Sequence, residues 1–269
     1  MRPSYGRVSR YGVMTLAWSL DKAGPLCRSV EDCALVLHAL QGQDDRDLTV
    51  TGVPFNWDAT LDIKKLRVGY LKAAFDEPRA VREEKDNDTA ALEKIRSLGV
   101  TLTPIEFPDY PIRDLLAIMY AEFSAAFDDL TRSKRDSLLA WQGRGSDANL
   151  YRTNRFVPAV EYIQATRVRT LLMEAMAKTM VDIDVYLAPI TSGRARIPGG
   201  AGNSLVGLNT TLTNLTGHPT VVVRNGFNAD GLPTSITFTG KVYGEAAMLA
   251  LAHAYQVSTE WHLKHPRLT

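Results

Sequence analysis

Short apolar segments that alternate with amphipathic helical segments are the feature that most restricts the fold. Leu66–Leu71 alternates as a strand does, Ala90–Leu98 has helical spacing, and Val100–Phe107 alternates again. Strand, helix and strand in this order form the βαβ unit of an α/β sheet. The same reasoning predicts further strands at 184–191, 219–223 and 235–238, and further helices at 111–130, 158–180, 204–216 and 245–261. We therefore expect an α/β fold, in which the polar segments 43–62 and 131–154 and the glycine-rich loop 192–203 are connections.

The composition of the chain does not indicate a particular class of binding partner. The 269 residues have a formal net charge of +1, so there is no electrostatic reason to expect nucleic acid or an anionic membrane as a partner. No apolar run approaches the roughly 18 residues of a membrane span, and the N-terminus lacks a signal-peptide pattern, so a cytoplasmic protein is expected. Cys27 and Cys33 are too few for a disulfide framework or a zinc knuckle, and Cys33 should be a small buried apolar residue.

The first forty residues contain the most distinctive sequence motifs. Tyr5–Gly12 reads YGRVSRYG, Ser19–Pro25 reads SLDKAGP, and both suit glycine-punctuated loops. Ser29 and Asp32 then form an S-x-x-D capping pattern at the start of a helix. Apolar residues recur at helical spacing behind the cap: Val30, Cys33, Ala34, Leu37 and Leu40.

This stretch resembles the amidase-signature family, which includes simple amidases and the A subunits of glutamyl/aspartyl-tRNA amidotransferases. Later blocks match the family in the same order, namely Asp184–Thr191, Asn214–Val223, Gly231–Gly240 and Ala252–Tyr255. The resemblance implies an α/β/α sandwich with a mixed sheet. It also implies that 1–269 is a single C-terminal portion of such a domain, without a second domain and with a sheet that is incomplete at its N-terminal side.

The resemblance implies amide C–N hydrolysis, in which a serine nucleophile, a bridging serine in a cis peptide and a neutral lysine act together. The sequence contains neither of the Gly-Ser-rich stretches that carry the two serines in the family, and no lysine can be given the catalytic role. We therefore assign no catalytic residue, metal or cofactor, and expect the chain alone to be inactive and truncated relative to the family. Its expected partners are a small-molecule amide, a separate N-terminal catalytic segment and, through unpaired strand edges, further copies in a homo-oligomer.

Two alternatives stay open for the role of the chain. It could be a non-catalytic binding or assembly module, or one half of a split amidase or of a split amidotransferase A subunit. The resemblance does not decide between an amidase and a component of an amidotransferase.

Other patterns that could carry chemistry are weaker. Ser19 and Lys22 satisfy S-x-x-K, the acylation pair of β-lactamases, but without that family's other motifs. The aspartates at 44, 45 and 47 lack the glycine and terminal glutamate of an EF-hand and suit a solvated connection. His262 and His265 fall short of the roughly four ligands of a structural zinc site.

The resemblance implies that this chain contributes one wall of a substrate pocket. In the family, the helix before the Gly-x-Pro strand faces the nucleophile. The residues that share one face of the predicted helix 204–216 are Val206, Asn209, Thr210 and Thr213, and we expect them to bind substrate. Amidotransferase A subunits place an acidic residue near the start of this helix, but the position here, near Gly207, is not acidic. This difference favours a general amidase over a glutamine-specific one.

Overall fold

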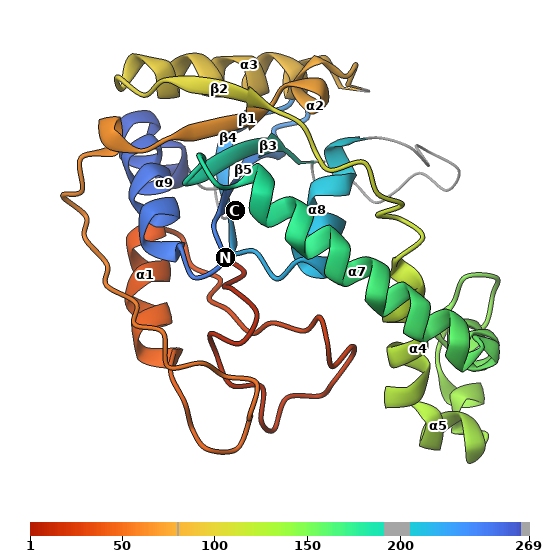
Figure 1. Cartoon of the computed structure of the whole chain (residues 1–269). Helices are drawn as coiled ribbons and strands as arrows, with labels where there is room; N and C mark the ends of the chain where they lie inside the picture. The colour runs from red at the N-terminus through yellow and green to blue at the C-terminus, as the bar shows by residue number, and fades with distance from the viewer. Residues whose placement is uncertain (80, 191–204, 265–269) are drawn as a thin grey trace.

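A mixed five-stranded sheet organises the fold in the computed structural model, which describes residues 1–79, 81–190 and 205–264 (Figure 1). The strand order is β2-β1-β3-β5-β4. β1 is parallel to both β2 and β3, whereas β5 runs antiparallel to β3 and to β4. The strands are β1 (Val68–Leu71), β2 (Leu102–Ile105), β3 (Val185–Pro189), β4 (Thr220–Phe227) and β5 (Pro233–Gly240).

Helices cover both faces of this sheet. The α-helices are α1 (Val30–Leu40), α2 (Lys72–Asp76), α3 (Arg82–Ser97), α4 (Leu116–Ala126), α5 (Asp128–Arg132), α6 (Asp147–Thr153), α7 (Ala159–Thr179), α8 (Leu205–Leu215) and α9 (Glu245–Thr259). Short 3-10 turns lie at Ile63–Lys65, Arg135–Leu138, Asn154–Phe156 and Trp261–Leu263. No helix of the described ranges combines the length and apolarity that crossing a membrane requires.

Alternation along β3 separates two hydrophobic cores. Val185 and Leu187 face a core that α1, α3 and α9 share, while Tyr186 and Ala188 face a second core with α2, α7 and α8. Successive strand side chains point to opposite faces, so a fully buried strand must be apolar on both. The predicted α/β/α sandwich with a mixed sheet is confirmed.

Helix α7 shows where periodicity was misleading. Its bounds agree with the prediction, but Val160 and Ile163, which have the spacing of an apolar helix face, are 65% and 55% exposed. In α7 only Leu172 and Met176 are buried. The reason is visible in Figure 1, where the first half of α7 extends beyond the sheet towards α4 and α5.

Three local predictions also differ from the structure. The predicted helix 111–130 is two helices that meet at Phe127, and the connection 131–154 contains α6, capped by the Ser146 hydroxyl. The helix predicted at Ala90–Leu98 is the C-terminal half of α3, which already begins at Arg82. The glycine-rich loop 192–203 lies outside the described residues. The Ser29 cap of α1 is confirmed, because its side chain accepts a hydrogen bond from the Asp32 amide at 2.9 Å.

Gly6 occupies a backbone position that a larger residue would disrupt. Its φ is +76°, and a Cβ there would lie 2.5 Å from the Thr49 carbonyl oxygen. We expect Gly6→Ala to lower the free energy of unfolding by more than the roughly 1–2 kcal/mol of a left-handed alanine alone. Gly12 is the matched control, because its φ is +80° but a Cβ there meets nothing within 4 Å. Urea unfolding should rank wild type, Gly12→Ala and Gly6→Ala in falling stability; equal losses for both variants would contradict a steric contribution at Gly6.

Candidate functional site

The predicted substrate-binding face of α8 lies against the sheet. Val206, Asn209 and Thr213 are buried and Thr210 is half-buried. The Tyr186 hydroxyl donates to the Asn209 side-chain oxygen at 2.7 Å. Burial raises the pKa of Tyr186, so this hydroxyl stays protonated and remains a donor.

The same network continues into β5. The Asn209 amide nitrogen donates to the Thr237 hydroxyl at 3.1 Å, and that hydroxyl donates to the Ala188 carbonyl at 2.7 Å. Thr213 donates to the Asn209 carbonyl at 2.9 Å within the helix. Asn209 therefore fixes α8 to the central strands, and Thr213 reinforces the helix behind it.

Three basic side chains converge on the C-terminal end of α8. The Lys22 amine donates to the carbonyls of Thr213, at 3.1 Å, and His218, at 2.7 Å. Arg2 donates to the Thr213 hydroxyl at 2.9 Å and also bonds Asn214. Arg169 of α7 donates to the Leu215 carbonyl at 2.6 Å. Helix C-terminal carbonyls lack intrahelical donors and carry partial negative charge, so cations are favoured there. We call Arg2, Lys22 and Arg169 the basic cluster.

The basic cluster shifts the protonation of its own members and of their neighbours. Desolvation lowers the pKa of Lys22 to about 7, and the positive charges of Arg2 and Arg169 add to this effect while Glu245 opposes it. Burial, followed by the charge of Lys22, lowers the pKa of His218 to about 4, so this histidine is neutral at pH 7. A lysine with a pKa near 7 is a group that can gain or lose a proton under physiological conditions.

Ser19 and Lys22 do not form a nucleophile and base pair. Within the described part of the chain, the buried Ser19 hydroxyl oxygen has no hydrogen-bond partner, and the Lys22 amine is engaged by two carbonyls. The Ser19 backbone is held firmly, since its amide donates to Glu122 at 3.0 Å and its carbonyl accepts from Arg169 at 2.8 Å. The S-x-x-K pattern therefore places a loop against α4 and α7 rather than building an acylation site.

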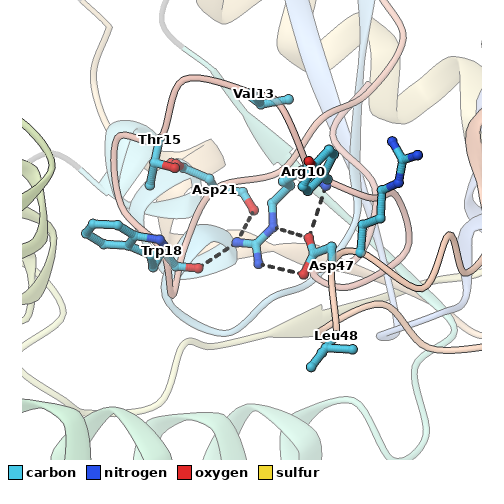
Figure 2. Close-up of a pocket in the computed structure, with 9 residues that line it drawn as sticks. Arg10, Val13, Thr15, Trp18, Asp21, Asp47 and Leu48 are labelled. Carbon is cyan, nitrogen blue, oxygen red and sulfur yellow. Dashed lines mark hydrogen bonds and ion pairs between the residues drawn. The ribbon is translucent and has the colours of Figure 1, made fainter.

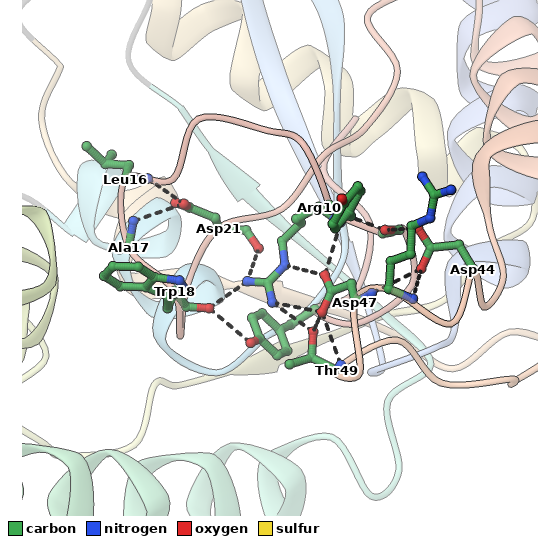
Figure 3. Close-up of polar contacts among 12 residues, drawn as sticks. Arg10, Leu16, Ala17, Trp18, Asp21, Asp44, Asp47 and Thr49 are labelled. Atoms are coloured by element: carbon green, nitrogen blue, oxygen red, sulfur yellow. Dashed lines mark hydrogen bonds and ion pairs between the residues drawn. The ribbon is translucent and has the colours of Figure 1, made fainter. Parts of the chain in front are cut away.

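A surface pocket lies in the N-terminal loops around Arg10 (Figure 2). It has a volume of about 190 Å³, with Trp18 and Leu48 among its lining residues. The Arg10 guanidinium donates to Asp47 at 3.0 Å, to Thr49 at 2.7 Å and to the Trp18 carbonyl at 2.5 Å. Figure 3 shows these hydrogen bonds converging on Arg10. The Arg10 side chain therefore joins the loop that contains Trp18 to the loop that contains Asp47 and Thr49.

Asp44 and Asp47, in the 43–62 segment, also accept hydrogen bonds that stabilise these loops. Asp44 accepts from the Ser9 hydroxyl at 2.5 Å, and the hydrogen bond from Arg10 is the main cause that holds the pKa of Asp47 well below its usual range. Asp44 and Asp45 are exposed, as expected of a solvated connection, and hydrogen bonds from Ser9 and Arg10 order the segment. No group of three metal-ligating side chains that could hold an ion occurs among residues 1–79, 81–190 and 205–264.

Sequence reasoning missed the long-range polar contacts. Arg7, in the YGRVSRYG stretch, is 1% exposed and pairs with the buried Glu245 of α9 at 2.8 Å. Arg2 and Arg169 carry no periodic signal that could link them to Lys22. The sequence singles out only Lys22, and for a different role.

The fold and these contacts define an α/β protein with a mixed sheet. The side chains of Arg2, Arg7 and Lys22 attach its N-terminal loops to α8 and α9, which pack on that sheet. The chain belongs to the amidase family: the sequence model described as Amidase matches residues 1–249.

Relatives of known sequence support this membership. The A subunit of the glutamyl-tRNA(Gln) amidotransferase of Ralstonia nicotianae is 31% identical over 314 aligned positions, covering 99% of this chain and 62% of the relative. Its counterpart from Geobacter metallireducens is 32% identical, covering 97% and 60%. The chain thus spans about three fifths of the length of these relatives.

Solved structures share the fold. An amidase family protein from Bacillus anthracis superposes with a TM-score of 0.76 at 22% identity, covering 99% of this chain and 54% of that one. The peptide amidase of Stenotrophomonas maltophilia gives 0.75 at 24% identity, covering 96% and 57%. These likenesses confirm the amidase-signature architecture.

Proposed function

We propose that this chain is a working part of an enzyme that hydrolyses a carboxamide to a carboxylate and ammonia. Family membership over residues 1–249 is the observation that carries the proposal. In this reaction water adds to the carbonyl carbon, the C–N bond breaks, and the nitrogen leaves as ammonia after gaining a proton. The chain supplies the scaffold, as one C-terminal portion of an amidase domain.

The groups that make and break bonds are proposed to come from a further polypeptide segment. Amide hydrolysis needs a nucleophile, a base and oxyanion donors. The one Ser and Lys combination that the sequence suggests, Ser19 and Lys22, does not meet in the structure. We therefore infer that the chain alone is inactive.

Helix α8 is proposed to form one wall of the substrate pocket through Val206, Asn209, Thr210 and Thr213. The hydrogen bonds of Asn209 and Thr213 to neighbouring structure support a rigid wall. Under this proposal the half-buried Thr210 contacts the substrate, and the buried Asn209 and Thr213 hold it in position from behind. The non-acidic Gly207 supports a general amide substrate over glutamine.

A non-catalytic assembly role is the second candidate. It is favoured by the description of the relatives as subunits of an amidotransferase. Under that proposal the chain acts as a partner in a multi-chain assembly, and it contributes no substrate contact of its own.

The purified chain should release no ammonia from hexanamide or benzamide and form no adduct with a serine-directed fluorophosphonate. The peptide amidase of Stenotrophomonas maltophilia, assayed on a peptide amide, serves as the positive control for ammonia detection. A stoichiometric adduct on any serine of this chain, or turnover, would contradict the inferred inactivity.

Joining the chain to a segment that carries the nucleophile tests the amidase role itself. We expect ammonia release from hexanamide, with the KM raised severalfold by Thr210→Ala and unchanged by Thr170→Ala on the exposed side of α7. A joined, folded protein that binds its partner chains but releases no ammonia would favour the assembly role.

A further inference from the structure

We propose that the pocket beside the basic cluster binds a small monocarboxylate that carries an apolar tail. The pocket lies where the N-terminal loop at 16–22, helix α4 and the C-terminal end of α8 meet, and has a volume of about 170 Å³. Arg2 and Lys22 both line it. This proposal rests on the geometry of the pocket and does not depend on the proposed amide hydrolysis.

The charge of the pocket favours an anion. Arg2 and Lys22 donate to neutral partners, namely the Thr213 hydroxyl and carbonyl, the Asn214 side chain and the His218 carbonyl. Neither makes an ion pair with a carboxylate in the described part of the chain. The Arg2 guanidinium uses two of its five N–H groups for these partners, so it retains donors that suit a planar carboxylate.

Nearby acidic groups are already committed elsewhere. The Asp21 carboxylate, also in the lining, accepts from the amides of Leu16 at 2.7 Å and Ala17 at 2.9 Å. Glu245 is bonded to Arg7 and to the Ser4 amide, and Glu122 to the Ser19 amide and the Tyr162 hydroxyl. The positive charge of the basic cluster is therefore compensated mainly by carbonyl groups, which a carboxylate can supplement.

The rest of the lining selects an apolar tail. Leu20, Met119 and Leu215 contribute apolar walls from the loop, α4 and α8. The volume is close to the roughly 150 Å³ of an apolar cavity that accepts benzene. A phenyl ring or a chain of about five carbons fits such a space. Hexanoate and benzoate are therefore suitable probes.

Binding should be coupled to protonation of Lys22. The charged groups that act on this amine are the cations Arg2 and Arg169 and the carboxylate of Glu245. His218 beside it is neutral, and the Asp21 carboxylate lies in the same pocket lining. A bound carboxylate adds negative charge and so favours the ammonium form. Proton uptake should accompany binding at pH 8, where the amine of the free protein is largely neutral.

Isothermal titration calorimetry of the whole chain with hexanoate tests the proposal. We expect saturable binding that weakens about tenfold between pH 6.5 and 8.5, with proton uptake at pH 8 shown by buffers of different ionisation enthalpy. Hexanamide, the uncharged isostere, should bind at least tenfold more weakly. Equal binding of the acid and the amide, or no saturation by tens of millimolar hexanoate, would overturn the proposal.

Three variants locate the site. Lys22→Met should reduce hexanoate affinity at least tenfold and abolish its pH dependence. Leu16→Trp enlarges a partly exposed lining residue without removing any member of the basic cluster. It should block hexanoate and benzoate alike, and it keeps the test valid if Lys22→Met does not fold. Lys241→Met is the matched control, because Lys241 pairs with Asp184 at 3.5 Å, outside this lining. Full binding by a folded Leu16→Trp protein would place the ligand elsewhere and refute the assignment.

Discussion

Replacing Arg7 with methionine should lower the free energy of unfolding by about 3–5 kcal/mol, the cost of leaving a buried charge without its partner. Arg7 and Glu245 are 1% and 0% exposed, with the guanidinium and carboxylate 2.8 Å apart. Glu245 also accepts the Ser4 amide at 2.8 Å, and Arg7 donates to the Tyr243 carbonyl at 3.2 Å. These contacts join the N-terminal loop to α9 across more than two hundred residues, so their loss should also loosen the loop.

Urea unfolding of Arg7→Met, Glu245→Met and the double variant separates the pair from its surroundings. Because an apolar pair of similar volume often replaces a buried ion pair at little cost, the double variant should be more stable than either single variant. Arg28→Met, at an exposed position, is the control and should change the free energy of unfolding by less than about 0.5 kcal/mol. Additive losses in the double variant would show that the two side chains act independently.

Local patterns were sufficient to predict much of the fold. The cap at Ser29 and the apolar run at β3 depend on neighbours within a few residues, and both have the predicted structure. The mixed sheet and the covering of both its faces followed from the resemblance to the amidase-signature family. Each of these features is set by short-range spacing or by a pattern spread over the whole chain.

Local sequence patterns could not predict contacts between residues that are far apart in the sequence. The exposure of Val160 depends on how far α7 extends past the sheet, which no helical periodicity encodes. Lys22 meets Thr213 and His218 across about two hundred residues, so its surroundings are fixed only by the assembled fold. For the candidate site, periodicity grouped Asn209 and Thr213 on one face of α8 but could not show that both hydrogen bond inside the protein.

The stability of the protein should rise with pH between about 7 and 10 through Lys22, an effect that Lys22→Met removes. The pKa of Lys22 is about 7 in the folded protein, against an ordinary value of 10.5. Between these values the unfolded chain binds the proton that the folded chain does not. The free energy of unfolding therefore increases by up to about 1.4 kcal/mol per pH unit in this window, and the contribution is constant below pH 7.

The difference between wild type and Lys22→Met isolates this contribution, since tyrosines and other lysines titrate in both proteins. From urea unfolding at several pH values, the wild-type advantage should grow by about 3–5 kcal/mol between pH 7 and 10.5, given the lowered pKa of Lys22. Lys65→Met is the control, because Lys65 is 84% exposed and should leave the pH profile parallel to that of wild type. Parallel profiles for wild type and Lys22→Met would mean that the Lys22 amine remains charged at the end of α8, and that the surrounding carbonyls fully compensate its burial.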